Sequence, residues 1–147
     1  MFLYRYLSNN NNLFSKIIWF YTYLFKRKYG IDIHTSTIIG EGLALWHAYN
    51  ITINSEAILG NNINLTKGVT IGREPRGSRK GSPKLGDKVY VGINSTIVRN
   101  ITIGNNVLIA PNTFVNRNIP DNSIVIGSPC QIIPSVNATE DYIYFLV

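Results

Sequence analysis

An aliphatic residue returns every six positions between residues 33 and 115, and this period constrains the fold more than any other feature of the chain. Two offsets interrupt it: eight residues separate Leu45 from Ile53, and fourteen separate Ile71 from Leu85. A fixed short period is typical of a stacked array, in which each repeat buries its face only against its neighbours. The series is Ile33, Ile39, Leu45, Ile53, Leu59, Leu65, Ile71, Leu85, Val91, Ile97, Ile103, Ile109 and Val115.

The position after the aliphatic residue is often glycine, as at Gly40, Gly60, Gly86 and Gly104. A residue without a side chain lets the backbone turn there without crowding. The chain also has 22 isoleucines, which favour strands, and 18 asparagines, which tolerate corners with positive φ. With three hexads in each triangular coil, residues 18 apart would stack in ladders. We therefore predict an all-β parallel β-helix of hexapeptide repeats; an antiparallel sandwich would not keep so many hexads in phase.

The chain of 147 residues fits one domain, with an N-terminal helical segment (1–29), a repeat region (30–134) and a C-terminal tail (135–147). Apolar spacing predicts an amphipathic helix over 13–28. One interpretation is a peripheral helix on the inner membrane surface; the other is a cap over the open β-helix, or a helix between protomers. The apolar part is too short for a span and no signal peptide is recognised, so we expect a cytoplasmic protein, either free or at the inner membrane face. The tail has no repeat register and is expected to pack back on the chain.

Composition excludes several classes of function. The single cysteine, Cys130, rules out an intramolecular disulfide framework, and two histidines cannot supply a three-histidine metal site, so no metal is expected. The net charge is +6, but the basic cluster is short and no nucleic-acid motif accompanies it. Nucleic acid is therefore not an expected partner.

Four ordered stretches carry a resemblance to a known family: Tyr29–His34, Gly68–Gly72, Pro83–Gly86 and Ile124–Pro129. With the repeat, they resemble the hexapeptide-repeat acyltransferases, and within these the serine acetyltransferase branch. The resemblance covers about residues 29–133. It implies a left-handed β-helix, acetyl-CoA as co-substrate, and a homotrimer with active sites between protomers.

His47 lies within the first offset, where two extra residues would lift it off the regular coil. Insertions on a strict solenoid are common places for function, and an imidazole can accept a hydroxyl proton. His47 also matches the family's catalytic histidine. Asp32, fifteen residues earlier, matches the aspartate that orients it; the alternative is that Asp32 caps the turn into the first coil.

By the same resemblance, acetyl-CoA would lie along a groove between protomers. Gly72, Ile93 and Ala110 would contact the pantetheine arm, while Pro111 and Ser128 would border the adenine end.

The second offset contains a loop (73–84) with five basic residues and one acid. This loop has two interpretations: a site for coenzyme A phosphates or an anionic acceptor, or a solvated, mobile loop.

The acceptor is inferred from departures from the family pattern. Serine acetyltransferases carry an aspartate before the catalytic histidine and an Arg-His pair before the Pro-Lys stretch; this chain has Trp46, Gly81 and Ser82 there. A charged amino acid would lose partners, whereas Trp46 and Tyr49 offer aromatic faces to a sugar. We therefore predict O-acetylation of a sugar hydroxyl, on a free or lipid-linked glycan of a bacterial capsule, O-antigen or exopolysaccharide, with Trp46, Tyr49 and Ser82 binding the acceptor. The alternatives are a serine O-acetyltransferase and a non-catalytic scaffold.

Overall fold

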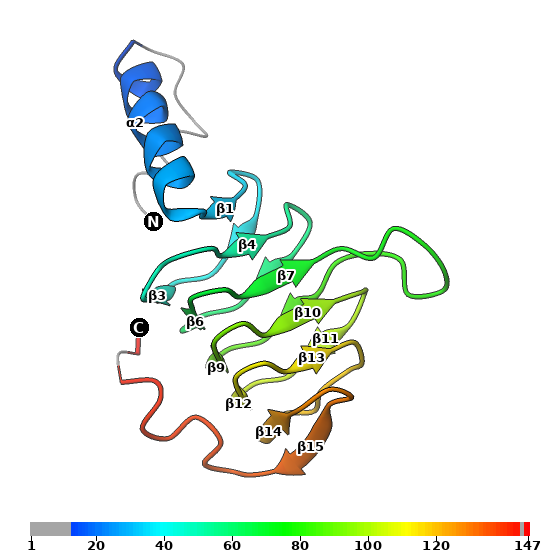
Figure 1. Ribbon diagram of the computed structural model, residues 1–147. Coiled ribbons are helices and arrows are strands. Elements are labelled where there is room, and N and C mark those ends of the chain that lie inside the picture. The colour runs from blue at the N-terminus through cyan, green and yellow to red at the C-terminus, as the bar shows by residue number, and fades with distance from the viewer. Residues whose placement is uncertain (1–12, 145) are drawn as a thin grey trace.

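The computed structural model describes residues 13–144, 146 and 147 and contains one long helix followed by a stack of short strands (Figure 1). The first twelve residues of the N-terminal segment lie outside the described residues. The elements are α2 (Leu13–Tyr29), β1 (Asp32–Ile33), β2 (Ile38–Ile39), β3 (Ala44–Trp46), β4 (Thr52–Ile53), β5 (Ile58–Leu59), β6 (Asn64–Thr66), β7 (Thr70–Gly72), β8 (Lys84–Leu85), β9 (Val89–Val91), β10 (Thr96–Val98), β11 (Thr102–Ile103), β12 (Val107–Ile109), β13 (Phe114–Val115), β14 (Ser123–Ile126) and β15 (Gln131–Pro134).

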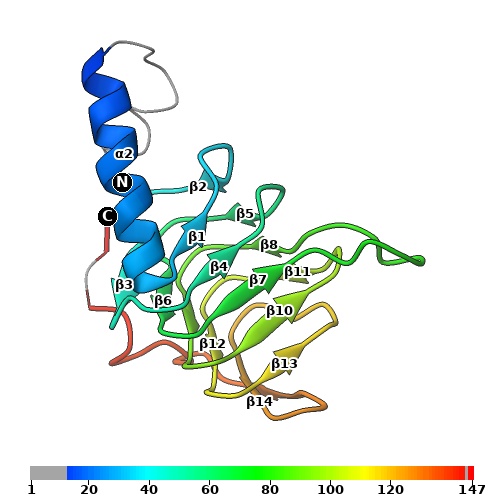
Figure 2. The same ribbon diagram turned by 45° about the horizontal axis from the view of Figure 1, so that its top comes forward.

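Three sheets form the sides of the coil. The first sheet has the order β1-β4-β7-β10-β13, the second β11-β8-β5-β2 and the third β15-β14-β12-β9-β6-β3. Paired residues lie 18 apart between β9 and β12, 20 apart between β1 and β4, and 26 apart between β5 and β8. The two and eight extra residues therefore leave the coil at its corners, and the predicted β-helix of hexapeptide repeats is confirmed. Figure 2 shows the longer insertion as the loop that stands out between β7 and β8.

The core is the column of aliphatic side chains that the period predicts. All thirteen members of the series are buried except Leu45, which is half-buried in the open first coil. Small polar residues such as Ser95 and Thr113 complete the interior, and the Ser95 hydroxyl donates to the Ala110 carbonyl oxygen at 2.8 Å. The hydrogen bonds between strands and the contacts between buried apolar side chains thus both join each coil to the next.

A column of glycines lines the edge where the chain passes from the second sheet to the third. A Cβ on Gly60 would lie 2.5 Å from the Gly86 carbonyl oxygen, so only glycine fits below the next coil. Beside this column, the side chain of one coil caps the backbone of the preceding coil: Asp87 Oδ1 accepts the Asn61 N–H at 2.7 Å, and Asn105 Oδ1 accepts the Asp87 N–H at 2.7 Å. The corners that follow use residues with positive φ: the asparagines Asn62, Asn106 and Asn122, as predicted, and in one coil Lys88.

Helix α2 is confirmed where the spacing predicted it, and its last turns lie beside the first coil while the rest of the helix extends away from it (Figure 1). Lys26 Nζ donates to the Ile33 carbonyl oxygen at 2.7 Å, and Phe25 and Lys26 line a cavity of about 260 Å³ with core residues such as Leu45. Most apolar side chains of the helix, such as Phe20, Leu24 and Phe25, are exposed, so the interpretations as a cap and as a helix between protomers stay predictions. No helix of the described chain is both long and apolar enough to cross a bilayer. The membrane-surface interpretation of residues 13–28 and the cytoplasmic location stay predictions.

The chain reverses after the last coil, which the repeat did not predict. β15 pairs antiparallel with β14, and the tail then returns along the third sheet to the first coils (Figure 1). Asn62 exchanges two hydrogen bonds with the backbone of Val147, at 2.9 and 3.2 Å, and the Tyr90 and Tyr142 rings meet edge-on at 4.8 Å. Burial, and then the nearby Tyr142, raise the pKa of Tyr90. The uncharged Tyr90 therefore contributes to the free energy of unfolding at neutral pH. This contribution is lost as the pH rises above about 10, where the phenol ionises in the unfolded chain.

The Gly60→Ala variant tests the glycine column. We expect a loss of about 1–3 kcal/mol in the free energy of unfolding, because the added Cβ overlaps backbone that cannot move without separating two coils. Chemical denaturation measures this loss. The matched control is Gly72→Ala, whose Cβ would meet no backbone and only the side chains of Val98, at 3.2 Å, and Thr70, at 3.8 Å, so it should lose less. An equal loss in both variants would contradict the argument.

Candidate active site

His47 stands at a widened corner between β3 and β4, on the edge where the chain passes from the third sheet to the first; this edge is called the histidine edge below. The next coil turns between β6 and β7 with two fewer residues. His47 is exposed and has a φ of 52°, and Asn50 at the other end of the corner has the same value. The later corners of this edge also have residues with positive φ, Gly68, Asn94 and Asn112, so this backbone conformation belongs to the corner itself. The first offset therefore lifts an imidazole out of the coil, as predicted.

Asp32 lies beside this corner at the start of β1. Its backbone N–H donates to the Ile51 carbonyl oxygen at 2.7 Å, and it pairs with Thr52, which opens β4 directly after the corner. The Asp32 side chain is exposed, and among the residues that the structure describes no hydrogen bond joins it to His47. The two groups thus share an edge without touching, and both are free to turn toward a ligand.

Four of the five residues predicted to hold the cofactor lie on the histidine edge, on the coils that follow His47. Ile93 accepts the Asn112 N–H at 2.8 Å, which stacks these two corners directly. Ala110 and Pro111 form the next corner, and the exposed Ser128 lies beyond β14. The structure therefore aligns them along the coil axis, as an extended ligand requires.

Gly72 and Ser82 lie elsewhere, on the edge where the chain passes from the first sheet to the second; this edge is called the loop edge. Gly72 ends β7, and Ser82 lies two residues before β8. Ser82 is buried, and its hydroxyl donates to Asn54 Oδ1 at 2.9 Å. Ser82 therefore holds the base of the loop and is not presented to an acceptor in this structure. Trp46 and Tyr49, by contrast, are exposed next to His47.

The loop itself is fixed to the coil at several points. Glu74 and Gly81 exchange two backbone hydrogen bonds at 3.0 Å, which makes a short hairpin of the segment. Arg79 extends to the last coils, where its Nη1 donates to the Asn116 carbonyl oxygen at 2.9 Å. The loop is therefore joined to the coil at its base and through Arg79, while residues 75–80 are exposed, and both interpretations of the loop stay predictions.

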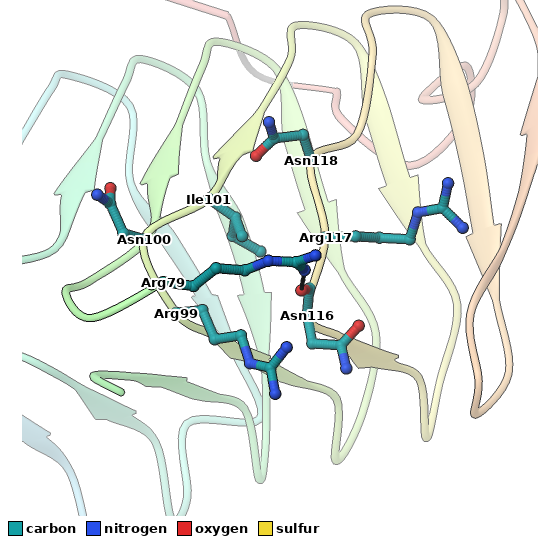
Figure 3. A pocket seen from close by; sticks show the side chains of 7 residues that line it. All are labelled: Arg79, Arg99, Asn100, Ile101, Asn116, Arg117 and Asn118. Carbon is teal, nitrogen blue, oxygen red and sulfur yellow. Dashed lines mark hydrogen bonds between the residues drawn. The ribbon is translucent and has the colours of Figure 1, made fainter. Parts of the chain in front are cut away.

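Sequence reasoning missed two arginines below this loop, Arg99 and Arg117. Together with Arg79 they line a cavity of about 710 Å³ on the loop edge (Figure 3). Their separation of 18 residues is the coil period, so the register alone predicts that they stack. The basic loop therefore does not stand alone: Arg99 and Arg117 lie on the same edge of the coil.

The second histidine, His34, has a local role. Its Nδ1 lies 2.7 Å from the Ser36 hydroxyl and accepts the Ser36 N–H at 3.2 Å within the turn after β1. Across the described residues, no group of three or more histidine, cysteine, aspartate or glutamate side chains is placed to hold a metal ion.

Comparison with known proteins gives a consistent result. Residues 82–117 match the family described as bacterial transferase hexapeptide (six repeats). Serine acetyltransferase 2 of Arabidopsis thaliana is 35% identical over 105 residues, covering 71% of this chain and 32% of that protein. The crystal structure of Neisseria gonorrhoeae serine acetyltransferase in complex with serine is 35% identical with a TM-score of 0.69, covering 79% of this chain and 47% of that one. A serine acetyltransferase in complex with CoA is 26% identical with a TM-score of 0.72, covering 88% and 52%.

This chain thus spans about a third to a half of the length of those proteins. Their names overturn one prediction: the assignment of a sugar hydroxyl in surface polysaccharide as the acceptor is wrong, and the alternative, serine, fits better. The structure shows why the departures were misinterpreted. Gly81 and Ser82 form hydrogen bonds at the base of the hairpin. These two residues therefore serve the packing of the loop and give no evidence for a sugar site. The repeat, the coil and the relatives agree, and the chain belongs to the hexapeptide-repeat acyltransferases of the left-handed β-helix type, in the serine acetyltransferase-like branch.

Proposed function

We propose that the protein is a serine O-acetyltransferase that uses acetyl-CoA as the acetyl donor. The observation that carries this proposal is the similarity to serine acetyltransferases, which extends over 71% of the chain at 35% identity. Neighbouring structures hold serine in one case and CoA in another, and these are the two substrates of the proposed reaction.

The proposed chemistry is a direct transfer in a ternary complex. His47 takes the proton of the serine hydroxyl while the hydroxyl oxygen attacks the thioester carbonyl carbon of acetyl-CoA. The C–S bond then breaks, and the proton held by His47 passes to the departing thiolate, so no acyl-enzyme forms. When the ligand is bound, the Asp32 carboxylate approaches His47, where it stabilises the imidazolium ion and fixes the orientation of the ring.

The proposed donor site follows the histidine edge. Ile93, Ala110 and Pro111 lie on successive corners beyond His47, with Ser128 at the far end. Corners of this kind present backbone groups and small side chains, which suit an amide-rich arm lying along the coil axis. The thioester end would then lie nearest His47.

The acceptor's ammonium group needs a partner, because this chain has Trp46 where the serine enzymes have an aspartate. Trp46 is 41% exposed and Tyr49 is 59% exposed, on either side of His47 in the sequence. An ammonium ion is attracted to the face of an indole ring, so Trp46 can take the role of the missing carboxylate. The acceptor carboxylate would face the basic loop of a neighbouring protomer, since the loop of the same protomer lies on the other edge.

A homotrimer with active sites between protomers accounts for the separation of Gly72 from His47. Gly72 lies on the loop edge, at the opposite end of the first sheet from His47. Within one protomer the two residues face different edges, whereas a cyclic assembly can bring the loop edge of one protomer against the histidine edge of the next.

The first test compares the two histidines. We expect purified protein to release free thiol from acetyl-CoA in the presence of L-serine, and His47→Ala to lower kcat by about 10²–10⁴-fold through loss of the general base. The control is His34→Ala, which removes the other exposed imidazole and should leave kcat within a few-fold. Full activity of His47→Ala would sink the assignment of the base, and no thiol release from the wild-type protein with L-serine would sink the proposed reaction.

The second test addresses the shared site. Gly72→Val should inactivate by blocking the close approach of the donor, and His47→Ala inactivates by removing the base. When the two variants are co-expressed, random assortment gives about a quarter of the sites both an intact histidine and an intact glycine, so about a quarter of the wild-type activity should return. Activity that stays at the level of the separate variants would place both residues in one protomer.

A further inference from the structure

We propose that helix α2 docks the protein on a membrane surface that contains anionic lipids, with the helix lying in the plane of the headgroups. One side of the helix carries an apolar stripe, made of Leu13, Ile17, Phe20 and Leu24. These residues recur at i, i+4, i+7 and i+11, so their side chains follow one line along the helix. Each of the four is between 46% and 76% exposed. The stripe is therefore an apolar surface open to solvent along most of the helix.

The other side of the helix faces the coil. Ile18, Thr22 and Lys26 lie at i, i+4 and i+8 and are half-buried. Lys26 Nζ donates to the Ile33 carbonyl oxygen, and Thr22 and Lys26 both line the cavity above the first coil. In Figure 1 and Figure 2 the helix extends from the first coil away from the stack of strands. The contacts with the coil therefore leave the stripe turned outward, where a flat surface can reach it.

Aromatic side chains widen the stripe on one flank. Phe14, Tyr21 and Phe25 are all more than half exposed, and they follow the stripe at the next position around the helix. The apolar face is thus broader than the narrow seam by which two helices of a coiled coil meet. A broad apolar face with aromatic residues is typical of helices that lie at a membrane surface, because the boundary between headgroups and acyl chains accepts side chains of any shape.

The charges of the helix select the occupant. Its charged residues are Lys16, Lys26, Arg27 and Lys28, and none is acidic. A lysine near the start of a helix is unfavourable for the helix dipole, so the dipole does not account for this pattern. Two copies of the helix would bring these cations together in a parallel or an antiparallel pair, with no acid on either helix to compensate. Anionic headgroups attract the same charges, so a lipid surface fits this face better than a second copy does.

Flotation of the full chain with lipid vesicles tests the proposal. We expect binding to vesicles of phosphatidylglycerol and phosphatidylcholine that weakens as salt is added, and binding to phosphatidylcholine alone that is weaker by about 10-fold or more. Absence of binding to the anionic vesicles would overturn the proposal. Neither acetyl-CoA nor serine is present in this measurement, so its failure is distinct from a failure of the proposed reaction.

A first pair of variants tests the apolar stripe. Phe20→Ser combined with Leu24→Ser should weaken binding to the anionic vesicles by about 10-fold or more, because two apolar side chains no longer enter the lipid. The matched control combines Ile133→Ser with Val136→Ser, which removes two exposed apolar side chains at the other end of the coil and should bind as the wild type does. Equal weakening in both variants would contradict docking through α2. Circular dichroism of the two variants separates a loss of docking from a loss of helix.

A second pair tests the charges and leaves the stripe intact. Arg27→Gln combined with Lys28→Gln should weaken binding to the anionic vesicles by about 10-fold or more, whereas Lys84→Gln combined with Lys88→Gln, on the coil, should have little effect. Sedimentation without lipid tests the other occupant. If the serine variant of the stripe lowers the mass of the oligomer, and the glutamine variant of α2 binds vesicles as the wild type does, the stripe joins copies of the chain and the proposal is overturned.

Discussion

The structure depends on the hydrogen bonding of each coil to the next, which forces every coil to close with the same circumference. Gly40, Gly60 and Gly86 donate backbone hydrogen bonds to the coil that follows at 2.9 Å, and the strands on either side continue the same ladders. Extra residues have no room within such a ladder, so they leave at a corner. The two offsets in the sequence are therefore two loops in the structure, and they carry His47 and the basic hairpin.

The sequence alone was sufficient for the coil and its core because both repeat. Each aliphatic residue of the series faces the same interior, and the glycine that follows it lies against the coil above. The tail was expected to pack back on the chain, but the particular contacts that it makes were not predictable. The reversal into β15 and the return of the tail to Asn62 depend on contacts between distant residues, for which no period exists. Ser82 belongs to the same group, since its hydrogen bond to Asn54 spans 28 residues.

For the site, the offsets located the histidine but not its surroundings. An insertion indicates that a side chain leaves the coil, and the φ of His47 shows how. The edge on which each other residue lies follows from its place in the coil: residues that end the third sheet share the histidine edge, and residues that end the first sheet share the loop edge. Gly72 belongs to the second group, so its distance from His47 could have been inferred from the register of β7.

The acceptor was predicted wrongly because the charged residues that serine acetyltransferases use to bind serine are absent from the corresponding positions of this chain. The aspartate position holds Trp46, and the Arg-His position holds the closed base of a hairpin, yet arginines appear on the same edge at Arg79 and Arg99. A solenoid can move a charge by a whole coil without disturbing its core, because each corner is nearly independent of the next. Charges in this fold are therefore better compared along an edge than residue by residue, and along the loop edge this chain is strongly cationic.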